Sequence, residues 1–344
     1  MKNIIVLMTA LVPTTGHADL IRFAASIPES KVHVLINGRS FEPVSTDKRV
    51  ESLQNHFHNF SNVIVKGSVV DDAPQNPESM PEGFWEWWRD EINNNFPEAE
   101  KRWDYVVASE PYGLNVAKSL NADFVPYDIG RTINPISGTC ARKNINDNWH
   151  DIIPEFRQYL IHNVVMFGQE SVGKTTLSKT VAEELDAVYV MEFARPYLES
   201  VGSEVTDEKM NTICFGQAGM QKSITKSAKT PVTVFDTDLF STVGYYRIYN
   251  EKETRQCRYF AEESKADTYY VLPDSIPFVE DELRYGGHER ESNTQFWVDL
   301  LEEFNLNYVI VPDGSIKEKT DFIVKDILKN LENKYYSIIT FERD

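Results

Sequence analysis

Cysteine is scarce in this sequence: 344 residues include only three, Cys140, Cys214 and Cys257, and these lie far apart. No pair has the C-x-x-C spacing of a zinc site or redox motif, and the set does not indicate a disulfide framework. The composition therefore gives no support for a disulfide-stabilised scaffold or a structural zinc centre. A reducing cytoplasm is the compartment that we expect.

Positive charge is also scarce, because 35 Lys and Arg residues face 53 Asp and Glu residues and leave a formal net charge of −18. An acidic field of this size disfavours binding to a nucleic-acid polymer or to an anionic membrane surface, so we expect neither partner. A small anionic substrate stays compatible if local amides, Arg, Lys or a metal ion offset the repulsion. The sequence does not indicate an oligomeric state and leaves a homo-oligomer open.

Long apolar runs are missing as well, since no stretch approaches the roughly 18 residues that cross a bilayer. The run from Ile4 to Val12, after Met1-Lys2-Asn3, resembles a short signal peptide. A buried first strand that leads into a ligand-binding loop explains the residues after the run better. We therefore favour the strand.

The length predicts about two domains, at roughly 100 to 200 residues per domain. In each half, β-type apolar runs alternate with amphipathic stretches, which is the pattern of a parallel sheet covered by helices. We place the domains at residues 1–159 and 160–344, with a helix that includes Trp149 closing the first. The expected strands are Ile4–Met8, Val32–Ile36, Val63–Val65, Tyr105–Ala108, Ile161–Phe167, Val188–Met191, Val232–Phe235, Thr268–Leu272 and Tyr308–Val311.

The strongest single signal lies between a predicted strand and a predicted helix, where the sequence fits G-x-x-x-x-G-K-[ST]. Its glycines let backbone N–H groups turn toward phosphate oxygens, and the helix adds its positive N-terminal end. The lysine supplies a cation, and the threonine after it supplies a ligand for Mg²⁺. The predicted ATP site consists of Gly168, Gln169, Glu170, Ser171, Val172, Gly173, Lys174, Thr175 and Thr176.

Acidic residues at the ends of second-half strands extend this site. Asp236 is the candidate for the magnesium side and Asp238 for contact with the acceptor substrate, although Asp after a strand commonly caps a helix. Glu192 is the candidate acceptor of a proton from an attacking hydroxyl, and Arg195 the candidate partner for phosphate charge. A structural ion pair between these two is the alternative.

Further along the second half, Asp281, Arg284 and Arg290 stand beside two glycines. Such a segment suits a mobile lid that closes over phosphates, and solvated surface is the alternative. With the phosphate loop, these residues indicate a small-molecule phosphotransferase rather than a motor or a GTPase switch.

The first half carries two motifs at predicted helix starts, where anions bind. Thr14-Thr15-Gly16-His17 follows the first strand; alone, such a histidine is more often a cap or surface residue. Later, Ile136-Ser137-Gly138-Thr139-Cys140-Ala141-Arg142 fits I-S-x-T-x-x-R and brings hydroxyls, amides and a guanidinium together. In one fold, the two sites could hold a triphosphate between them.

Together these motifs carry a family resemblance. The T-x-G-H and I-S-x-T-x-x-R pair resembles the signature of nicotinamide-mononucleotide adenylyltransferases, within the nucleotidylyltransferase superfamily. When Ser109–Gly113, the phosphate loop, Glu192–Arg195, Asp236–Asp238 and Asp281 with Arg284 are added, the order resembles the bifunctional NadR-type family along almost the whole chain. That family couples the adenylyltransferase to a ribosylnicotinamide kinase. The resemblance implies a Rossmann-like HxGH nucleotidylyltransferase domain followed by a P-loop kinase domain.

The resemblance also implies roles for single residues. Thr14 takes the place of the first histidine in H-x-G-H, and His17 contacts the ATP phosphates. Met8–Val12 departs from the Gly-x-Phe-x-Pro of relatives, which leaves the backbone contacts near Ala10 open. Because the first strand begins almost at once, with no helix-turn-helix before it, we expect no repressor function. The implied ATP-binding set is Thr9, Ala10, Thr14, Gly16, His17, Ser137, Gly138, Thr139 and Arg142.

Within this frame, Trp85 and Trp88 offer a platform for a pyridinium ring, because an indole face attracts a flat cation. The two residues are three apart and share a helix face, so a plain core contact is the alternative. Arg39 and Arg49 are candidates for contact with the mononucleotide phosphate.

From the resemblance we expect a two-step synthesis of NAD. ATP with Mg²⁺ would phosphorylate ribosylnicotinamide to nicotinamide mononucleotide (NMN) in the second half. The first half would join NMN to a second ATP and release pyrophosphate, so NAD is a product rather than a redox cofactor. Two alternatives stay open: a nucleotidylyltransferase–kinase fusion for another vitamin or nucleoside, and a non-catalytic nucleotide-sensing regulator.

Overall fold

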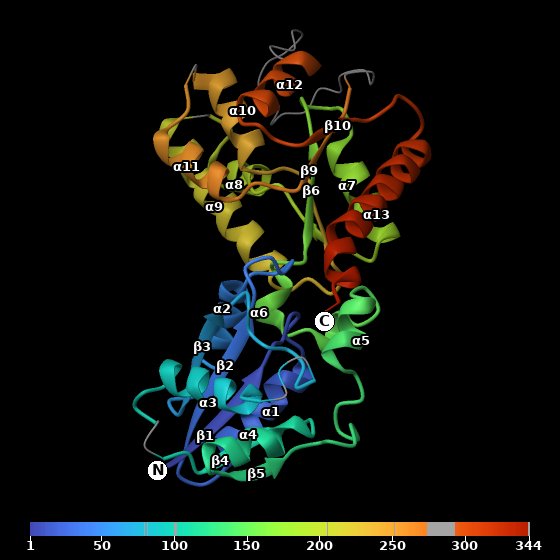
Figure 1. Cartoon of the computed structure of the whole chain (residues 1–344). Coiled ribbons are helices and arrows are strands. Elements are labelled where there is room, and N and C mark those ends of the chain that lie inside the picture. Colours follow the sequence, from blue (N-terminus) through green and yellow to red (C-terminus); the bar gives the residue numbers. More distant parts are fainter. Residues whose placement is uncertain are drawn as a thin grey trace. The chain divides into compact units, whose positions relative to one another are not determined.

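The computed structural model describes residues 1–78, 80, 82–99, 102–204, 206–250, 252–273 and 293–342. The chain divides into two compact units: unit 1 comprises Met1–Tyr159 with Asn333–Asp344, and unit 2 comprises Leu160–Glu332. Each unit contains one five-stranded sheet with helices around it (Figure 1). All the strand pairings in both sheets are parallel, so the predicted α/β class with parallel sheets is confirmed.

The sheet of unit 1 has the strand order β3-β2-β1-β4-β5. Ile5 on β1 and Leu35 on β2 point to one face, where they pack with Ile92 and Phe96 from the layer that contains α3. The elements of this unit are β1 (Lys2–Met8), α1 (Thr15–Ser26), β2 (Ser30–Gly38), α2 (Thr46–His56), β3 (Val63–Val69), α3 (Phe84–Asn95), β4 (Tyr105–Ala108), α4 (Tyr112–Leu120), β5 (Asp123–Pro126), α5 (Gly138–Lys143), the 3₁₀ helix η1 (Trp149–Asp151) and α6 (Pro154–Arg157).

The sheet of unit 2 has the order β10-β9-β6-β8-β7, with β6 in the centre. Val165 and Phe167 on β6 join a core cluster that includes the fully buried Trp297. The elements are β6 (His162–Phe167), α7 (Lys174–Glu184), β7 (Val188–Val190), α8 (Ala194–Val201), α9 (Asp207–Thr225), β8 (Val232–Phe235), α10 (Leu239–Asn250), α11 (Arg255–Glu263), β9 (Thr268–Val271), α12 (Thr294–Glu303), β10 (Tyr308–Ile310) and α13 (Ile316–Thr340), which runs past the end of unit 2.

Two local predictions differ from the structure. β5 is an edge strand that pairs only with β4 among the described residues, and none of its four residues is fully buried. A four-residue edge strand with two exposed positions gives almost no hydrophobic pattern, so it escaped detection. Trp149, which we expected in a helix that closes the first domain, is buried and begins the three-residue helix η1 rather than a longer helix.

Among the described residues, no helix combines the length and apolar character needed to cross a membrane.

The packing of α10 against α12 yields a prediction on stability. A Cβ atom at Gly244 would lie 2.5 Å from an indole carbon of Trp297, whereas a Cβ atom at Gly219 on α9 would meet nothing within 4 Å. Gly244→Ala should overpack the core and lower the free energy of unfolding by about 1–3 kcal/mol. Gly219→Ala should raise it by about 0.5–1 kcal/mol, because only the glycine entropy penalty is removed.

Urea unfolding of the two variants measures both effects. Equal stabilities for the two variants would contradict the close packing of Gly244 on Trp297.

Candidate functional site

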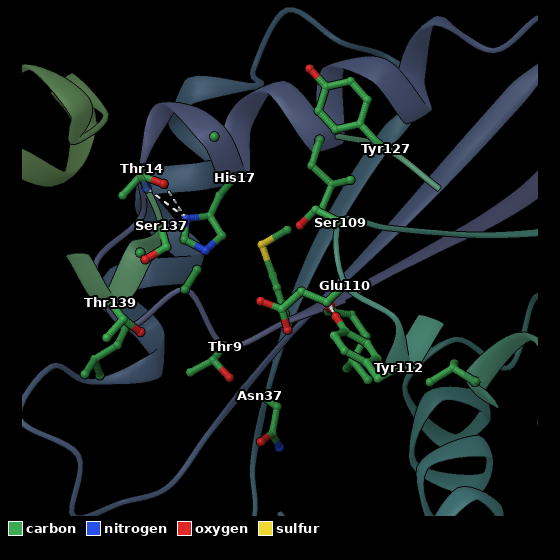
Figure 2. Close-up of a pocket in the computed structure, with 18 of the residues that line it drawn as sticks. Thr9, Thr14, His17, Asn37, Ser109, Glu110, Tyr112, Tyr127, Ser137 and Thr139 are labelled. Carbon is green, nitrogen blue, oxygen red and sulfur yellow. Dashed lines mark hydrogen bonds between the residues drawn. The ribbon is translucent and has the colours of Figure 1, made fainter. Parts of the chain in front are cut away.

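Unit 1 contains a cavity of about 680 Å³ at the carboxyl ends of its strands (Figure 2). β1 and β4 are neighbours, and the chain leaves them toward β2 and β5 on opposite sides, which opens a crevice where ligands bind in such sheets. All nine residues of the implied ATP-binding set line this cavity. Segments distant in the sequence, from Thr9 to Arg142, are thus brought together as predicted.

His17 is held in one orientation at the start of α1. The backbone N–H of Thr14 donates a hydrogen bond of 3.0 Å to His17 Nδ1, and the Thr14 hydroxyl lies 2.8 Å from the same atom (Figure 2). Because Nδ1 accepts, the proton of the neutral imidazole sits on Nε2. Nε2 has no hydrogen-bond partner among the described residues, so a hydrogen-bond donor is available to a ligand in the cavity.

Two features of the surroundings keep this imidazole neutral and fixed. Burial, which is the larger cause, and the positive charge of Arg131 together lower the pKa of His17 to about 4. Gly138 packs against the ring, since a Cβ atom there would lie 2.8 Å from His17 Cε1. The position of the His17 ring at the start of α1 therefore depends on Gly138, a residue of the second motif.

The second motif begins α5. The Ser137 side chain caps this helix by accepting a 3.0 Å hydrogen bond from the N–H of Cys140. Arg142 lines the cavity, and its buried Nε has no hydrogen-bond partner among the described residues. The guanidinium is thus the group of this motif that is best placed to meet an anion.

Trp85 and Trp88 fit both interpretations of their spacing, a platform for a ligand ring and a contact with the core. Trp85 and Trp88 project from α3 and line the cavity. Trp88 is also buried, at 7% exposure, and Trp85 packs on the core cluster of unit 1. Each indole therefore presents part of its surface to the cavity and part to the core.

Neither arginine proposed for the mononucleotide phosphate lies in the cavity lining. Arg39 donates a long hydrogen bond of 3.4 Å to the carbonyl of Ala73. Arg49 is fully buried, forms an ion pair with Glu42 and donates to the carbonyl of Thr9 at 2.9 Å. The expectation for Arg49 is wrong because a buried carboxylate and backbone carbonyls already occupy its guanidinium.

Several residues in the lining belong to none of the sequence motifs, namely Asn37, Tyr127, Asp128, Arg131 and Asn134. Asp128 accepts hydrogen bonds from the N–H groups of Thr132, Ile133 and Asn134, and these bonds lower its pKa. Its carboxylate thereby organises the loop that carries Arg131. The repeated Asp and Asn around this loop are turn-forming residues, and this was the only sequence signal.

Unit 2 contains a smaller cavity of about 220 Å³ around the loop after β6. This loop has three residues in the left-handed region: Gly168 at φ 131°, Ser171 at φ 62° and Gly173 at φ 88°. A Cβ atom at Gly168 would lie 3.0 Å from the carbonyl oxygen of Leu272, so only glycine fits. The turn conformation that the motif predicts is present.

Lys174 is folded back over the loop. Its Nζ donates to the carbonyls of Gly168 at 2.8 Å and Gln169 at 2.6 Å, and also to the hydroxyl of Tyr245 at 3.2 Å. Glu170, Ser171 and the segment from Gly173 to Thr176 line the cavity, whereas Gly168, Gln169 and Val172 are not part of its lining. A bound phosphate could replace the carbonyls as partner of the ammonium group.

Two acidic side chains meet the same cavity. Burial raises the pKa of Glu192 despite the nearby charge of Lys174, which opposes the shift. Asp236 is 3% exposed, and the hydroxyl of Tyr189 donates to its Oδ2 at 3.0 Å. Arg195 also lines the cavity. The grouping of Glu192, Asp236 and Lys174 at one cavity agrees with the strand-end placement expected from the sequence.

Asp238 does not lie in the cavity lining. Its carboxylate accepts hydrogen bonds from Ser241 N–H at 2.9 Å and from the Tyr269 hydroxyl at 2.9 Å, and it is 1% exposed. Contact with an acceptor substrate was therefore the wrong expectation. Asp238 instead caps the start of α10, which was the alternative interpretation.

The predicted lid residues Asp281, Arg284 and Arg290 lie outside the described residues.

Comparisons with known proteins identify similar chains. Residues 163–319 match the AAA domain family model. The trifunctional NAD biosynthesis/regulator protein NadR of Escherichia coli (strain K12) is 28% identical over 243 residues, which cover 69% of this chain and 59% of the relative. The protein of the same name from Salmonella typhimurium (strain LT2) is 26% identical over 334 residues, covering 91% and 80%.

Solved structures extend the likeness to the whole fold. NadR protein in complex with NR matches with a TM-score of 0.70 at 21% identity, covering 100% of this chain and 98% of that one. NadR protein in complex with NAD and AMP-PNP matches with a TM-score of 0.68 at 22% identity, covering 100% and 99%. The resemblance to NadR-type proteins that the motifs predict is confirmed. The chain spans 59% of the Escherichia coli relative's length in the matched region.

The environment of His17 generates a prediction on its titration. Its pKa should lie near 4, far below the ordinary value of 6.5, because burial disfavours the imidazolium. Arg131→Ala should raise this pKa but leave it below 6.5, since burial is the larger cause. NMR titration of the ring C–H signals measures both values, and a midpoint near 6.5 in the unaltered chain would contradict the buried environment.

The lowered pKa of His17 also makes the stability of the fold depend on pH. Because the folded-state pKa lies below the unfolded value, the unfolded chain binds more protons between pH 4 and 6.5. The contribution of His17 to stability is therefore complete above pH 6.5 and is lost as the pH falls toward 4.

Proposed function

We propose that this chain carries out two consecutive steps of NAD synthesis, first as a ribosylnicotinamide kinase and then as an NMN adenylyltransferase. The observation that carries this proposal is the presence of two separate cavities, each lined by the residues of one nucleotide-binding motif. The likeness to NadR-type proteins supports the choice of substrates. We further propose that both reactions take place in the cytoplasm.

The domain assignment follows from the motifs. Residues 1–159 would form a Rossmann-like HxGH nucleotidylyltransferase domain, and residues 160–344 a P-loop kinase domain. The parallel sheets with a motif loop after the central strand, β1 in one unit and β6 in the other, support this assignment.

In the kinase step, the 5′-hydroxyl of ribosylnicotinamide attacks the γ-phosphorus of ATP, and ADP leaves. Glu192 accepts the hydroxyl proton, and its raised pKa makes it a stronger base than an exposed carboxylate. Lys174 moves from the loop carbonyls to the phosphate oxygens, where its charge stabilises the transition state. Arg195, at the same cavity, can bind the transferred phosphate.

The residues of unit 2 suit a magnesium ion. Thr175 and Asp236 line one cavity and offer the oxygen ligands that Mg²⁺ prefers. Tyr189 binds Oδ2 of Asp236, and Oδ1 has no hydrogen-bond partner among the described residues. When bound there, Mg²⁺ would neutralise charge on the β- and γ-phosphates.

In the adenylyltransfer step, the phosphate of NMN attacks the α-phosphorus of a second ATP, and pyrophosphate leaves. The Nε2–H of neutral His17 donates a hydrogen bond to the phosphates, while Arg142 and Arg131 offset their charge. Trp85 or Trp88 provides an aromatic face for the pyridinium ring. No protein nucleophile is required, because positioning and electrostatics suffice.

The two activities should be separable by single substitutions. His17→Ala is expected to lower NAD formation from ATP and NMN by roughly 100-fold or more, because the transition state loses a preorganised donor. It should leave the phosphorylation of ribosylnicotinamide unchanged. Lys174→Ala should have the opposite pattern. Coupled assays of ADP release and NAD formation on the purified full chain, each with Mg²⁺, measure the two rates.

Thermal unfolding of both variants serves as the folding control. Loss of both activities in either well-folded variant would contradict two independent sites. If the unaltered chain forms no NAD from ATP and NMN, the proposed adenylyltransferase is wrong.

A further inference from the structure

Gln217 on α9 is a buried amide that joins two loops of unit 2. Its side chain is 1% exposed. The N–H of Phe193 donates to Gln217 Oε1 at 2.8 Å, and Gln217 Nε2 donates to the carbonyl oxygen of Thr237 at 2.9 Å. Both hydrogen-bonding ends of the amide are thus used on backbone groups.

The two backbone groups belong to the loops that carry the acidic residues of the kinase cavity. Phe193 follows Glu192, and Thr237 follows Asp236. The loops leave the parallel neighbours β7 and β8, whose pairing runs to Val190 opposite Phe235. One further bond, from Asp236 N–H to the Val190 carbonyl at 2.9 Å, prolongs the ladder.

Beyond that bond the two segments of the chain separate, because Phe193 leads into α8 and Thr237 leads toward α10. An amide side chain has one acceptor and one donor group, so it can continue the ladder as a peptide unit would. Gln217 takes that place. One side chain thus satisfies two backbone groups that the sheet no longer pairs, the buried carbonyl of Thr237 and the partly buried N–H of Phe193.

The approach of α9 to this point is close. A Cβ atom at Gly216 would lie 2.1 Å from Cε1 of Phe193, so only glycine lets α9 reach the Phe193 ring in this arrangement. The helix and the loop are therefore in direct contact next to the amide. α8 and α9 lie side by side in Figure 1, in agreement with their contacts.

We propose that Gln217 is a positioning residue for the kinase step, which sets the separation between Glu192 and Asp236 through their loop backbones. This inference rests on the proposed kinase function. Losing either hydrogen bond leaves a buried or partly buried peptide group unpaired, and the loop would shift to find another partner. Such a shift moves Glu192 relative to Asp236 without removing either carboxylate.

The test compares substitutions at Gln217 with a matched control on the same helix. Gln217→Met keeps the length of the side chain and removes both hydrogen bonds. Gln217→Glu keeps the acceptor for Phe193 N–H and removes the donor to Thr237. Gln221→Met is the control, because Gln221 is also buried on α9, at 6% exposure, but, unlike Gln217, does not line the cavity.

Kinetics of ribosylnicotinamide phosphorylation, with ATP and Mg²⁺, provide the readout on the full chain. For both Gln217 variants, kcat is expected to fall by about 10- to 100-fold, the effect of misplacing reacting groups by around 1 Å. The KM for ATP should change by less than about threefold, because the phosphate loop is untouched. Gln221→Met should keep the unaltered kcat, and NAD formation from NMN should be unchanged in every variant.

Rates are expressed per folded molecule, with the folded fraction taken from urea unfolding, so that loss of folding alone leaves kcat unchanged. An unaltered kcat for Gln217→Met, or a rise in KM without a fall in kcat, overturns the positioning role. Failure of the unaltered chain to phosphorylate ribosylnicotinamide would instead overturn the proposed kinase.

Discussion

The parallel arrangement of the strands is the constraint on which both candidate sites depend. Parallel strands end at one edge of a sheet, so every loop that follows a strand in a unit collects at that edge. In unit 1 this brings the loop after β1 close to residues beyond β4, and in unit 2 it brings the loops after β6, β7 and β8 to one cavity. Residues scattered along the sequence become neighbours for this reason.

Electrostatic conditions at the two edges differ from those of the molecule as a whole. The chain carries a net charge of −18, yet Arg142 and Arg131 line one cavity and Lys174 and Arg195 line the other. Unit 1 adds a histidine whose pKa is too low for it to bear charge near neutral pH. The two guanidinium groups and the neutral imidazole that would meet an anion there therefore keep the same charge state between pH 6 and 8.

The sequence predicted those features that are encoded locally. A glycine-bounded loop between strand and helix, or a Thr-x-Gly-His at a helix start, specifies its backbone within a few residues, and both adopt the expected conformation. Arg49 and Asp238 show where local pattern is insufficient. An arginine pairs with phosphate or with a buried carboxylate according to what packs around it, and an Asp after a strand serves catalysis or capping with the same local sequence. Gln217 and Arg131 gave no motif at all, because their partners lie on other elements of the fold.

The contact of Gly138 with the imidazole of His17 couples the two motifs of unit 1 sterically. The two motifs of unit 1 are far apart in the chain, yet one occupies the space that the other would need for a larger side chain. A larger side chain at position 138 would have to displace the imidazole or the backbone at the start of α5. The orientation of the histidine is therefore set in part by a residue that lies more than a hundred positions away in the sequence.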